Sequence, residues 1–110
     1  MGAFVKGDVV VVPFPFADLS GKKKRPALVV ANLLGDDVVL CLITSQKAKD
    51  NYAISLEHGD FATGSLRQLS NIRPNRLFTA DSGIVLYRAG VIAASKLNEV
   101  TGKIVAIMTK

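Results

Sequence analysis

Four consecutive cations, Lys22, Lys23, Lys24 and Arg25, stand directly before a proline and an apolar run in the stretch DLSGKKKRPALVV, residues 18–30. A guanidinium presents a planar fork of donors to phosphate oxygens and keeps its charge at any relevant pH. The three lysines suit a sequence-independent phosphate clamp. We therefore interpret Arg25 as the residue that faces a phosphodiester, and the lysines as the residues that hold it.

Hydroxyl and amide side chains follow the next apolar run, at Thr44, Ser45 and Gln46. If residues 27–32 and 37–43 form a hairpin, Arg25 falls opposite Thr44, and Ser45 is nearly as good a partner. RNA carries its own nucleophile, the 2′-OH, so its cleavage needs positioning, proton movement and stabilisation of the charged phosphorane. Each preorganised donor contributes on the order of 3 kcal/mol to the transition state. The alternative interpretation is a solvated basic loop and an ordinary turn.

The residue inventory excludes several other kinds of site. One histidine, His58, and one cysteine, Cys41, cannot assemble a zinc site of ordinary composition. Asp36 and Asp37 are the only adjacent carboxylates, and they fall in an apparent turn, where acids are common. No Walker loop, dinucleotide fingerprint or nucleophile elbow occurs. The sequence therefore predicts no metal and no cofactor.

Composition predicts a single domain, residues 1–110, with an anionic partner. The net charge is +5, and the pI is about 9.6. Hydrophobic residues make up 49% of the chain, and the mean hydropathy is +0.32, so we expect some apolar surface to lie in a subunit interface. The single cysteine fits a reducing compartment, and no apolar run suits a membrane span or a signal peptide. We expect a cytoplasmic protein.

Short runs rich in β-branched residues, each bounded by turn residues, predict a small antiparallel barrel or sandwich. These runs cover residues 8–12, 27–31, 38–43, 52–56, 66–72, 77–80 and 84–87, the last continuing to residue 93. The run at 38–43 contains Cys41, which we expect to be a buried small hydrophobe. PFPF, residues 13–16, cannot be a central strand because its prolines lack ladder donors, so it opens a loop that ends at Lys24.

One helix is expected, at the C-terminal end of the chain, with Ser95 as its N-cap. Apolar residues recur on one face of it at helical spacing: Leu97, Val100, Ile104, Ile107 and Met108. This stripe suits the core of the domain and a twofold interface about equally well. The expected fold class is mainly β, a small barrel with a terminal helix.

Four ordered motifs give the chain a resemblance to a known family. KGDVVVVPFPF, KKKRPALVV, LITSQ and NIRPNRLFTAD together resemble the MazF/PemK/Kid family of toxin endoribonucleases, and KLNEVTGKIVAIM is similar to the family's C-terminal helix. The resemblance implies an SH3-like barrel that forms a homodimer. It implies metal-free, sequence-specific cleavage of single-stranded RNA that leaves a 2′,3′-cyclic phosphate and a 5′-OH. It also implies a cognate antitoxin, with operator DNA as a further partner of the complex, and no membrane.

The resemblance also assigns roles to matched positions. It implies that Arg25 acts as acid and phosphate stabiliser, that Thr44 acts as base or hydrogen-bonding partner, and that Ser45 and Gln46 line the site. Arg73 and Asn75 fall where some members place a catalytic Arg and Asp. An amide cannot act as a general base, so Asn75 is better suited to reading a base edge. For Arg73 and Arg76, RNA contact and a salt bridge or solvated face are about equally expected.

Two other functions are open to a chain of this composition. A relative of the CcdB family would poison DNA gyrase by binding it, but those toxins act through a Trp near the C-terminus. This chain has no Trp and ends in IMTK. A basic barrel could also bind RNA or its operator without cutting. The presence of both Arg25 and Thr44 favours cleavage.

Overall fold

The structure is a computed structural model that describes residues 4–13, 24–45 and 51–110. These residues form one sheet, two short 3₁₀-helices and one α-helix. In chain order the elements are β1 (Asp8–Pro13), β2 (Lys24–Asn32), β3 (Asp37–Thr44), β4 (Ile54–Leu56), η2 (His58–Asp60), β5 (Phe61–Gly64), β6 (Ser70–Asp81), η3 (Ser82–Ile84), β7 (Tyr87–Ile92) and α1 (Ala94–Met108).

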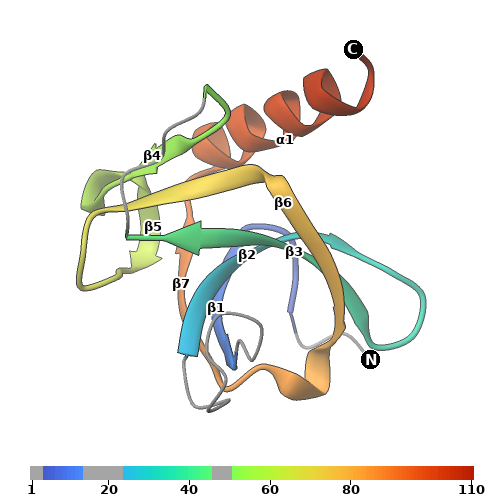
Figure 1. The fold of residues 1–110 in the computed structure, drawn as a ribbon. Coiled ribbons are helices and arrows are strands. Elements are labelled where there is room, and N and C mark those ends of the chain that lie inside the picture. Colours follow the sequence, from blue (N-terminus) through green and yellow to red (C-terminus); the bar gives the residue numbers. More distant parts are fainter. Residues whose placement is uncertain (1–3, 14–23, 46–50) are drawn as a thin grey trace.

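The sheet has the strand order β4-β6-β3-β2-β1-β7-β5, and every neighbouring pair is antiparallel. It curls into a half-barrel with α1 lying along one side (Figure 1). The predicted fold class, mainly β with a C-terminal helix, is confirmed. The long strand β6 bends around the assembly and pairs with both β3 and β4.

Two hydrophobic cores lie on opposite faces of the central strands, because each strand alternates its side chains between the faces. The helix-side core includes Val9, Leu28 and Ile43, with Val100 of α1. The second core includes Val10, Ala27 and Leu40, and it is covered by Phe4, Phe78, Ala80 and Val85. This two-sided burial explains why the apolar runs of the sequence show little alternation.

The β2–β3 hairpin has the register that the sequence predicts. Ala27 pairs with Leu42, Leu28 with Cys41, and Val29 with Leu40. A bulge then shifts the register by one residue before the turn. The turn is closed by a 2.9 Å hydrogen bond from the Leu33 amide to the Asp37 carbonyl, and Gly35 takes a φ of 78°, which favours glycine.

Residues 66–72 and 77–80 do not form two strands, as the sequence predicts, but contribute to the single strand β6. The reason is a wide bulge. Cys41 pairs with Leu77 and Ile43 with Ile72, so residues 73–76 all lie opposite Leu42 of β3. The strand continues on both sides of the bulge, and residues 66–69 precede it outside the sheet.

Three smaller predictions are also corrected. Residues 61–64, which the sequence analysis leaves unassigned, form strand β5 beside β7. The last strand begins at Tyr87, because residues 82–84 form η3. The strand at 52–56 is only three residues long, Ile54–Leu56.

Helix α1 begins two residues earlier than predicted. Ala93 is its N-cap, no side chain caps it, and Ser95 lies inside the first turn. Of the apolar stripe, Val100 is buried, and Leu97 and Ile104 pack against the helix-side core, whereas Met108 is 67% exposed. Most of the stripe therefore serves the core of its own chain. No helix within the described ranges is both long and apolar enough to cross a membrane.

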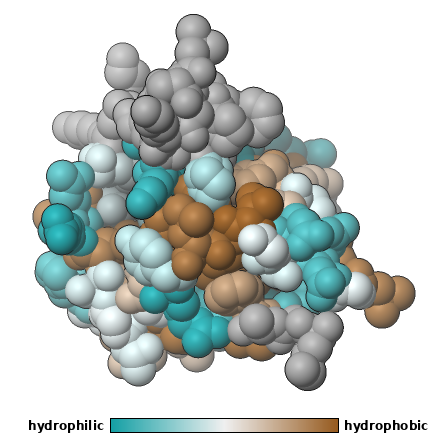
Figure 2. Space-filling view, turned by 90° about the horizontal axis from the view of Figure 1, so that it is seen from below, coloured by the Kyte–Doolittle hydropathy of each residue, from teal (hydrophilic) through white to brown (hydrophobic). Residues whose placement is uncertain are grey.

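The segment between β6 and β7 leaves apolar side chains at the surface. Ile84 and Leu86 are 40% and 49% exposed, next to Val85, which packs against the second core. This segment lies at the bottom of the molecule in Figure 1, and Figure 2 shows that side with a hydrophobic area at its centre and hydrophilic residues around it.

Candidate functional site

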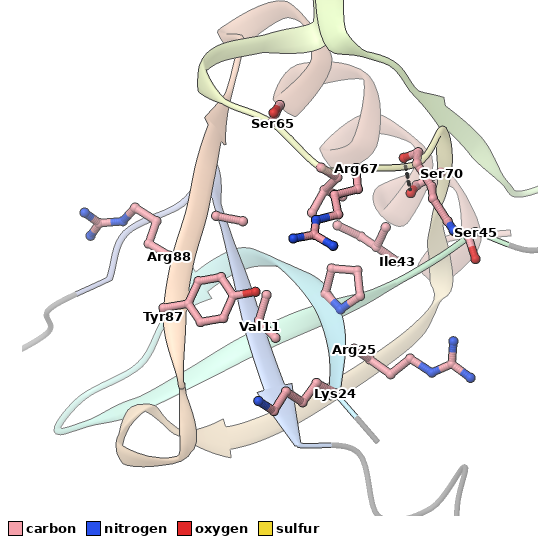
Figure 3. Close-up of a pocket in the computed structure, with 14 residues that line it drawn as sticks. Val11, Lys24, Arg25, Ile43, Ser45, Ser65, Arg67, Ser70, Tyr87 and Arg88 are labelled. Atoms are coloured by element: carbon pink, nitrogen blue, oxygen red, sulfur yellow. Dashed lines mark hydrogen bonds between the residues drawn. The ribbon is translucent and has the colours of Figure 1, made fainter. Parts of the chain in front are cut away.

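Alternation along β2 separates the two cations at its first positions. Lys24 shares its face with Pro26 and Leu28, on the helix side, whereas Arg25 shares its face with Ala27 and Val29 of the second core. Figure 3 shows the Lys24 and Arg25 side chains extending in opposite directions. The sequence analysis groups these cations, but the strand directs them to different surfaces.

Thr44 lies on the same face of the sheet as Arg25. On β3, Cys41 and Ile43 belong to the helix-side core, so Leu42 and Thr44 point the other way. The register that pairs Ala27 with Leu42 sets Arg25 across from Thr44 two residues further on. Both residues are half-buried at the open end of the hairpin. A guanidinium and a hydroxyl therefore share one face at adjacent strand ends.

The bulge of β6 carries the other predicted contacts. Residues 73–76 lie opposite Leu42, two positions before Thr44 on the same face of β3. Asn75 and Arg76 are exposed, whereas Arg73 is half-buried, and its carbonyl accepts a 2.9 Å hydrogen bond from the Cys41 thiol. The bulge thus holds Asn75 and Arg76 at the surface near the end of the hairpin, where an RNA strand could contact them.

Burial confirms the interpretation of Cys41 as a structural residue. Its side chain has no exposed surface, and burial raises the pKa of the thiol from the ordinary value of 9.0 to about 12. The hydrogen bond to the Arg73 carbonyl opposes this shift only in part. A thiol in this environment stays neutral and serves to fix the start of the bulge.

A groove of about 590 Å³ opens on the helix-side face of β2, and Arg25 near the start of that strand also lines it. Its apolar floor includes Val11, Pro26 and Ile43, and Tyr87 and Arg67 rise from β7 and from the loop before β6. The full lining is Val11, Lys24, Arg25, Pro26, Ile43, Ser45, Ser65, Leu66, Arg67, Gln68, Ser70, Tyr87, Arg88 and Ala89. The described lining residues include four cations and no carboxylate.

The cations of the groove are not equivalent. Figure 3 shows the Arg67 guanidinium and the Tyr87 ring directed into the space above the floor, while the Arg88 side chain points away from it. Arg88 forms a 3.1 Å ion pair with the buried carboxylate of Asp8, and its guanidinium lies 5.5 Å from the centroid of the Phe4 ring. Arg67 therefore supplies positive charge inside the groove, and Lys24 and Arg25 lie at its edge.

A close contact between two glycines fixes the loop that carries Arg67. Gly64 at the end of β5 pairs with Gly90 of β7. A Cβ at Gly64 would lie 2.3 Å from the Ala89 carbonyl oxygen, and one at Gly90 would lie 2.5 Å from the Thr63 carbonyl oxygen. Only two glycines allow this approach of backbones, which sets residues 65–68 beside Tyr87.

Nearly the whole chain matches the sequence model of one protein family. Residues 5–108 match the model of the PemK-like, MazF-like toxins of type II toxin-antitoxin systems. The chain belongs to this family. The family is one of endoribonucleases, and the resemblance drawn from the four sequence motifs is confirmed.

Solved structures of MazF-like proteins share the fold of this MazF-like chain. An endoribonuclease in complex with its cognate antitoxin, from a mycobacterial species, superposes with a TM-score of 0.77 at 14% identity, over 96% of this chain and 95% of the other. MazF from Deinococcus radiodurans gives 0.75 at 20% identity, over 97% of both chains. The MazE–MazF complex of that organism gives 0.72 at 19% identity, over 96% and 95%. No curated protein matches the sequence.

The structure divides the predicted site residues of this MazF-like chain into three groups. Arg25 and Thr44 share one face, and the bulge presents Asn75 and Arg76 near the same end of the hairpin. Lys24 and Ser45 belong to the groove on the helix-side face. Lys22, Lys23 and Gln46, together with most of the predicted loop, lie outside the described residues.

Sequence reasoning missed two sets of polar residues. Asn71 pairs with Thr44 across β3 and β6, and Ser55 pairs with Asn71 across β6 and β4, which extends a polar row from the candidate site. Arg67 and Tyr87 of the groove are the second set. The bulge in β6 and the unassigned strand β5 set these positions, and neither has a clear signal in the sequence.

Carboxylate, imidazole and thiol groups do not converge within the part of the chain that the structure describes. Among residues 4–13, 24–45 and 51–110, no group of three or more His, Cys, Asp or Glu side chains is arranged to hold a metal ion. The acids of these ranges include Asp8, paired with Arg88, and Asp60, which lies 3.6 Å from the Lys96 ammonium.

Proposed function

We propose that this MazF-like toxin is an endoribonuclease that cuts single-stranded RNA at specific short sequences without a metal ion. The observation that carries the proposal is the placement of Arg25 and Thr44 on one face of the sheet, across from each other at the open end of the β2–β3 hairpin. Membership of the toxin family supports the same reaction.

In the proposed reaction, the 2′-OH of the substrate gives its proton to solvent water as its oxygen attacks the adjacent phosphorus. The bond from phosphorus to the 5′-oxygen breaks, and that oxygen takes up a proton from solvent water. The products are a 2′,3′-cyclic phosphate and a 5′-OH, and the reaction consumes no water and uses no metal ion. Arg25 stabilises the charge on the phosphorane and hydrogen-bonds the leaving oxygen. Thr44 orients the 2′-OH through its hydroxyl.

The surrounding residues have binding roles in this proposal. Asn75 and Arg76, exposed on the bulge, contact a base edge and a phosphate, respectively, and Arg73 fixes the bulge through its backbone. Lys24 and Ser45 contact the RNA on the helix-side face. We assign Lys22, Lys23 and Gln46 to the same clamp from their positions in the sequence.

The decisive experiment incubates the purified protein with a long RNA in excess EDTA and maps the ends of the fragments. We expect cuts at a short recurrent sequence, with cyclic-phosphate and 5′-OH ends, and no cleavage of an all-DNA strand. Cleavage that stops in EDTA and returns with magnesium would contradict the metal-free mechanism. A protein that binds RNA without cutting would support the non-catalytic alternative.

We also propose that the toxin is a homodimer and binds a cognate antitoxin, with operator DNA bound by the complex of the two. Ile84 and Leu86 are 40% and 49% exposed at the side of the molecule where Figure 2 shows a hydrophobic area, which supports burial of this side by a second chain. The structural neighbours include toxins solved with an antitoxin. Sedimentation at micromolar concentration should report about twice the 11.7 kDa mass of one chain. A monomer that cuts RNA at full rate would contradict the dimer.

A further inference from the structure

The groove on the helix-side face of β2 adjoins the candidate site, because Arg25 near the start of the strand also lines it. Its volume of about 590 Å³ lies in the range of pockets that hold small organic molecules. Its apolar floor of Val11, Pro26 and Ile43 is bordered by one aromatic ring, Tyr87, which is 56% exposed. The pairing of Tyr87 with Val11 keeps the ring on the same face as this floor.

We propose that this groove is a subsite for a nucleotide that flanks the cleaved bond, and that the base of this nucleotide stacks on Tyr87. The inference rests on the proposed function and adds a second contact surface to it. A half-exposed aromatic ring beside an apolar floor is the common platform on which proteins stack unpaired bases. Ser45 and Gln68 border the groove with groups that can hydrogen-bond a base edge.

The charge of the groove favours a nucleotide over a neutral ligand. Arg67 points into the space above the floor, and Lys24 stands at its border (Figure 3). The described lining contains no carboxylate that could neutralise either of them. Asp8, which pairs with Arg88, is not one of the lining residues. A phosphate attached to the stacked nucleotide would therefore find two cationic partners.

The fold explains how one RNA strand can reach both surfaces. Lys24 and Arg25 are neighbours in the chain at the open end of β2, and their side chains lie on opposite faces. A strand of RNA that crosses this end of the hairpin meets Thr44 on one face and the groove on the other, with Arg25 at the edge of the groove. The nucleotide in the groove is then adjacent to the scissile phosphate and contributes to sequence preference.

The absence of Trp from the chain provides a direct assay of this stacking. The protein contains two tyrosines, and Tyr52 lies elsewhere, with its hydroxyl 2.6 Å from the Lys110 ammonium. Replacing Tyr52→Phe leaves Tyr87 as the only tyrosine fluorophore, and Tyr87→Phe leaves Tyr52. The probe is a mixture of 2′-O-methyl RNA heptamers, which cannot be cut because they lack the nucleophile.

We expect the heptamers to quench the fluorescence of the Tyr52→Phe protein and to leave that of the Tyr87→Phe protein unchanged. Affinity for the heptamers should fall about 5- to 160-fold in Tyr87→Ala, since stacking of a base on an aromatic ring contributes by that factor. It should stay near the wild-type value in Tyr87→Phe and in the matched control Tyr52→Ala. In Arg67→Ala, the slope of log affinity against log salt concentration should become shallower by about 0.7, which corresponds to the loss of one phosphate contact.

Failure of this inference and failure of the proposed function are distinguishable. If the heptamers quench Tyr87 but the toxin cuts no RNA, the proposed subsite stands and the proposed nuclease function is wrong. Cleavage by a toxin in which the heptamers quench neither tyrosine would retain the nuclease and overturn the subsite. Quenching of Tyr87 by an acidic peptide but not by the heptamers would also overturn it, since the groove would then bind a protein segment.

Discussion

Replacing Arg25→Ala and Lys24→Ala tests whether two adjacent cations have different roles. In the structure these residues are consecutive on β2, but their side chains lie on opposite faces of the strand. Arg25 shares its face with Thr44, and Lys24 borders the groove. We therefore assign Arg25 to stabilisation of the transition state and Lys24 to the binding of RNA.

The expected magnitudes follow from these positions. Loss of one preorganised donor to a developing charge lowers kcat by about 10²- to 10³-fold, and a guanidinium offers two such donors, so Arg25→Ala should lose at least about 10³-fold. Loss of one phosphate contact to single-stranded RNA reduces the salt slope by about 0.7, which corresponds to about 2.6-fold in affinity across a fourfold change in salt. Both residues lie outside the hydrophobic cores, so each variant should lose less than about 1 kcal/mol of stability.

The assay measures kcat under saturating RNA and measures binding to an uncleavable RNA at several salt concentrations. Arg25→Ala should lose cleavage and keep most of its binding, whereas Lys24→Ala should keep kcat and bind with a shallower salt slope. Arg25→Lys is the matched control for charge without the planar fork, and it should remain strongly impaired. Equal losses of kcat in Arg25→Ala and Lys24→Ala would refute the separation of roles by strand alternation.

Three further predictions concern the scaffold of the site. Gly64→Ala should destabilise the fold by more than about 2 kcal/mol, because the new Cβ would lie 2.3 Å from a backbone oxygen. The control Gly35→Ala has a similar φ but open space around it, and it should lose about 1 kcal/mol. Equal melting temperatures of the two variants would contradict this prediction. Asp8→Ala should cost about 1–3 kcal/mol in urea unfolding, since it removes the ion pair with Arg88 and the acceptor of the Val5 amide; an unchanged midpoint would show that this contact is unimportant. Above pH 9 the wild type should lose stability relative to Cys41→Val. The thiol of the unfolded chain, with its pKa of 9.0, then releases its proton, whereas the thiol of the folded chain keeps its proton up to about pH 12. Parallel pH profiles of stability for the two proteins would contradict the raised pKa.

The β2–β3 hairpin could be predicted from the sequence in detail. Its two runs are separated by a short turn with Gly35, and the two-residue periodicity of strands then fixes which positions face each other. Counting from the turn, where the Leu33 amide bonds to the Asp37 carbonyl, would set Arg25 opposite Ser45, and the bulge between Val29 and Ala31 moves the pairing by one residue to Thr44. The position opposite Arg25 could therefore be predicted to within one residue.

The second half of the sheet could not be predicted in the same way. The bulge at residues 73–76 changes the pairing of β6 with β3 by three residues, and Pro74, which lacks an amide donor, is buried within it. A bulge of this size depends on tertiary contacts, such as the Cys41 thiol bonded to the Arg73 carbonyl. The pairing of Asn71 with Thr44 depends on that offset, and so it could not be found from spacing.

The same bulge explains how Asn75 can contribute to an enzyme that lacks an acid at this position. Four residues opposite one force the chain of β6 outward, which exposes Asn75 and Arg76 while Ile72 and Leu77 on either side keep their pairing with β3. An amide at such a surface position can both donate to and accept from a base edge, and it carries no charge that would repel a phosphate. In the proposed mechanism the catalytic charge comes from Arg25, and the bulge contributes to the selection of the RNA.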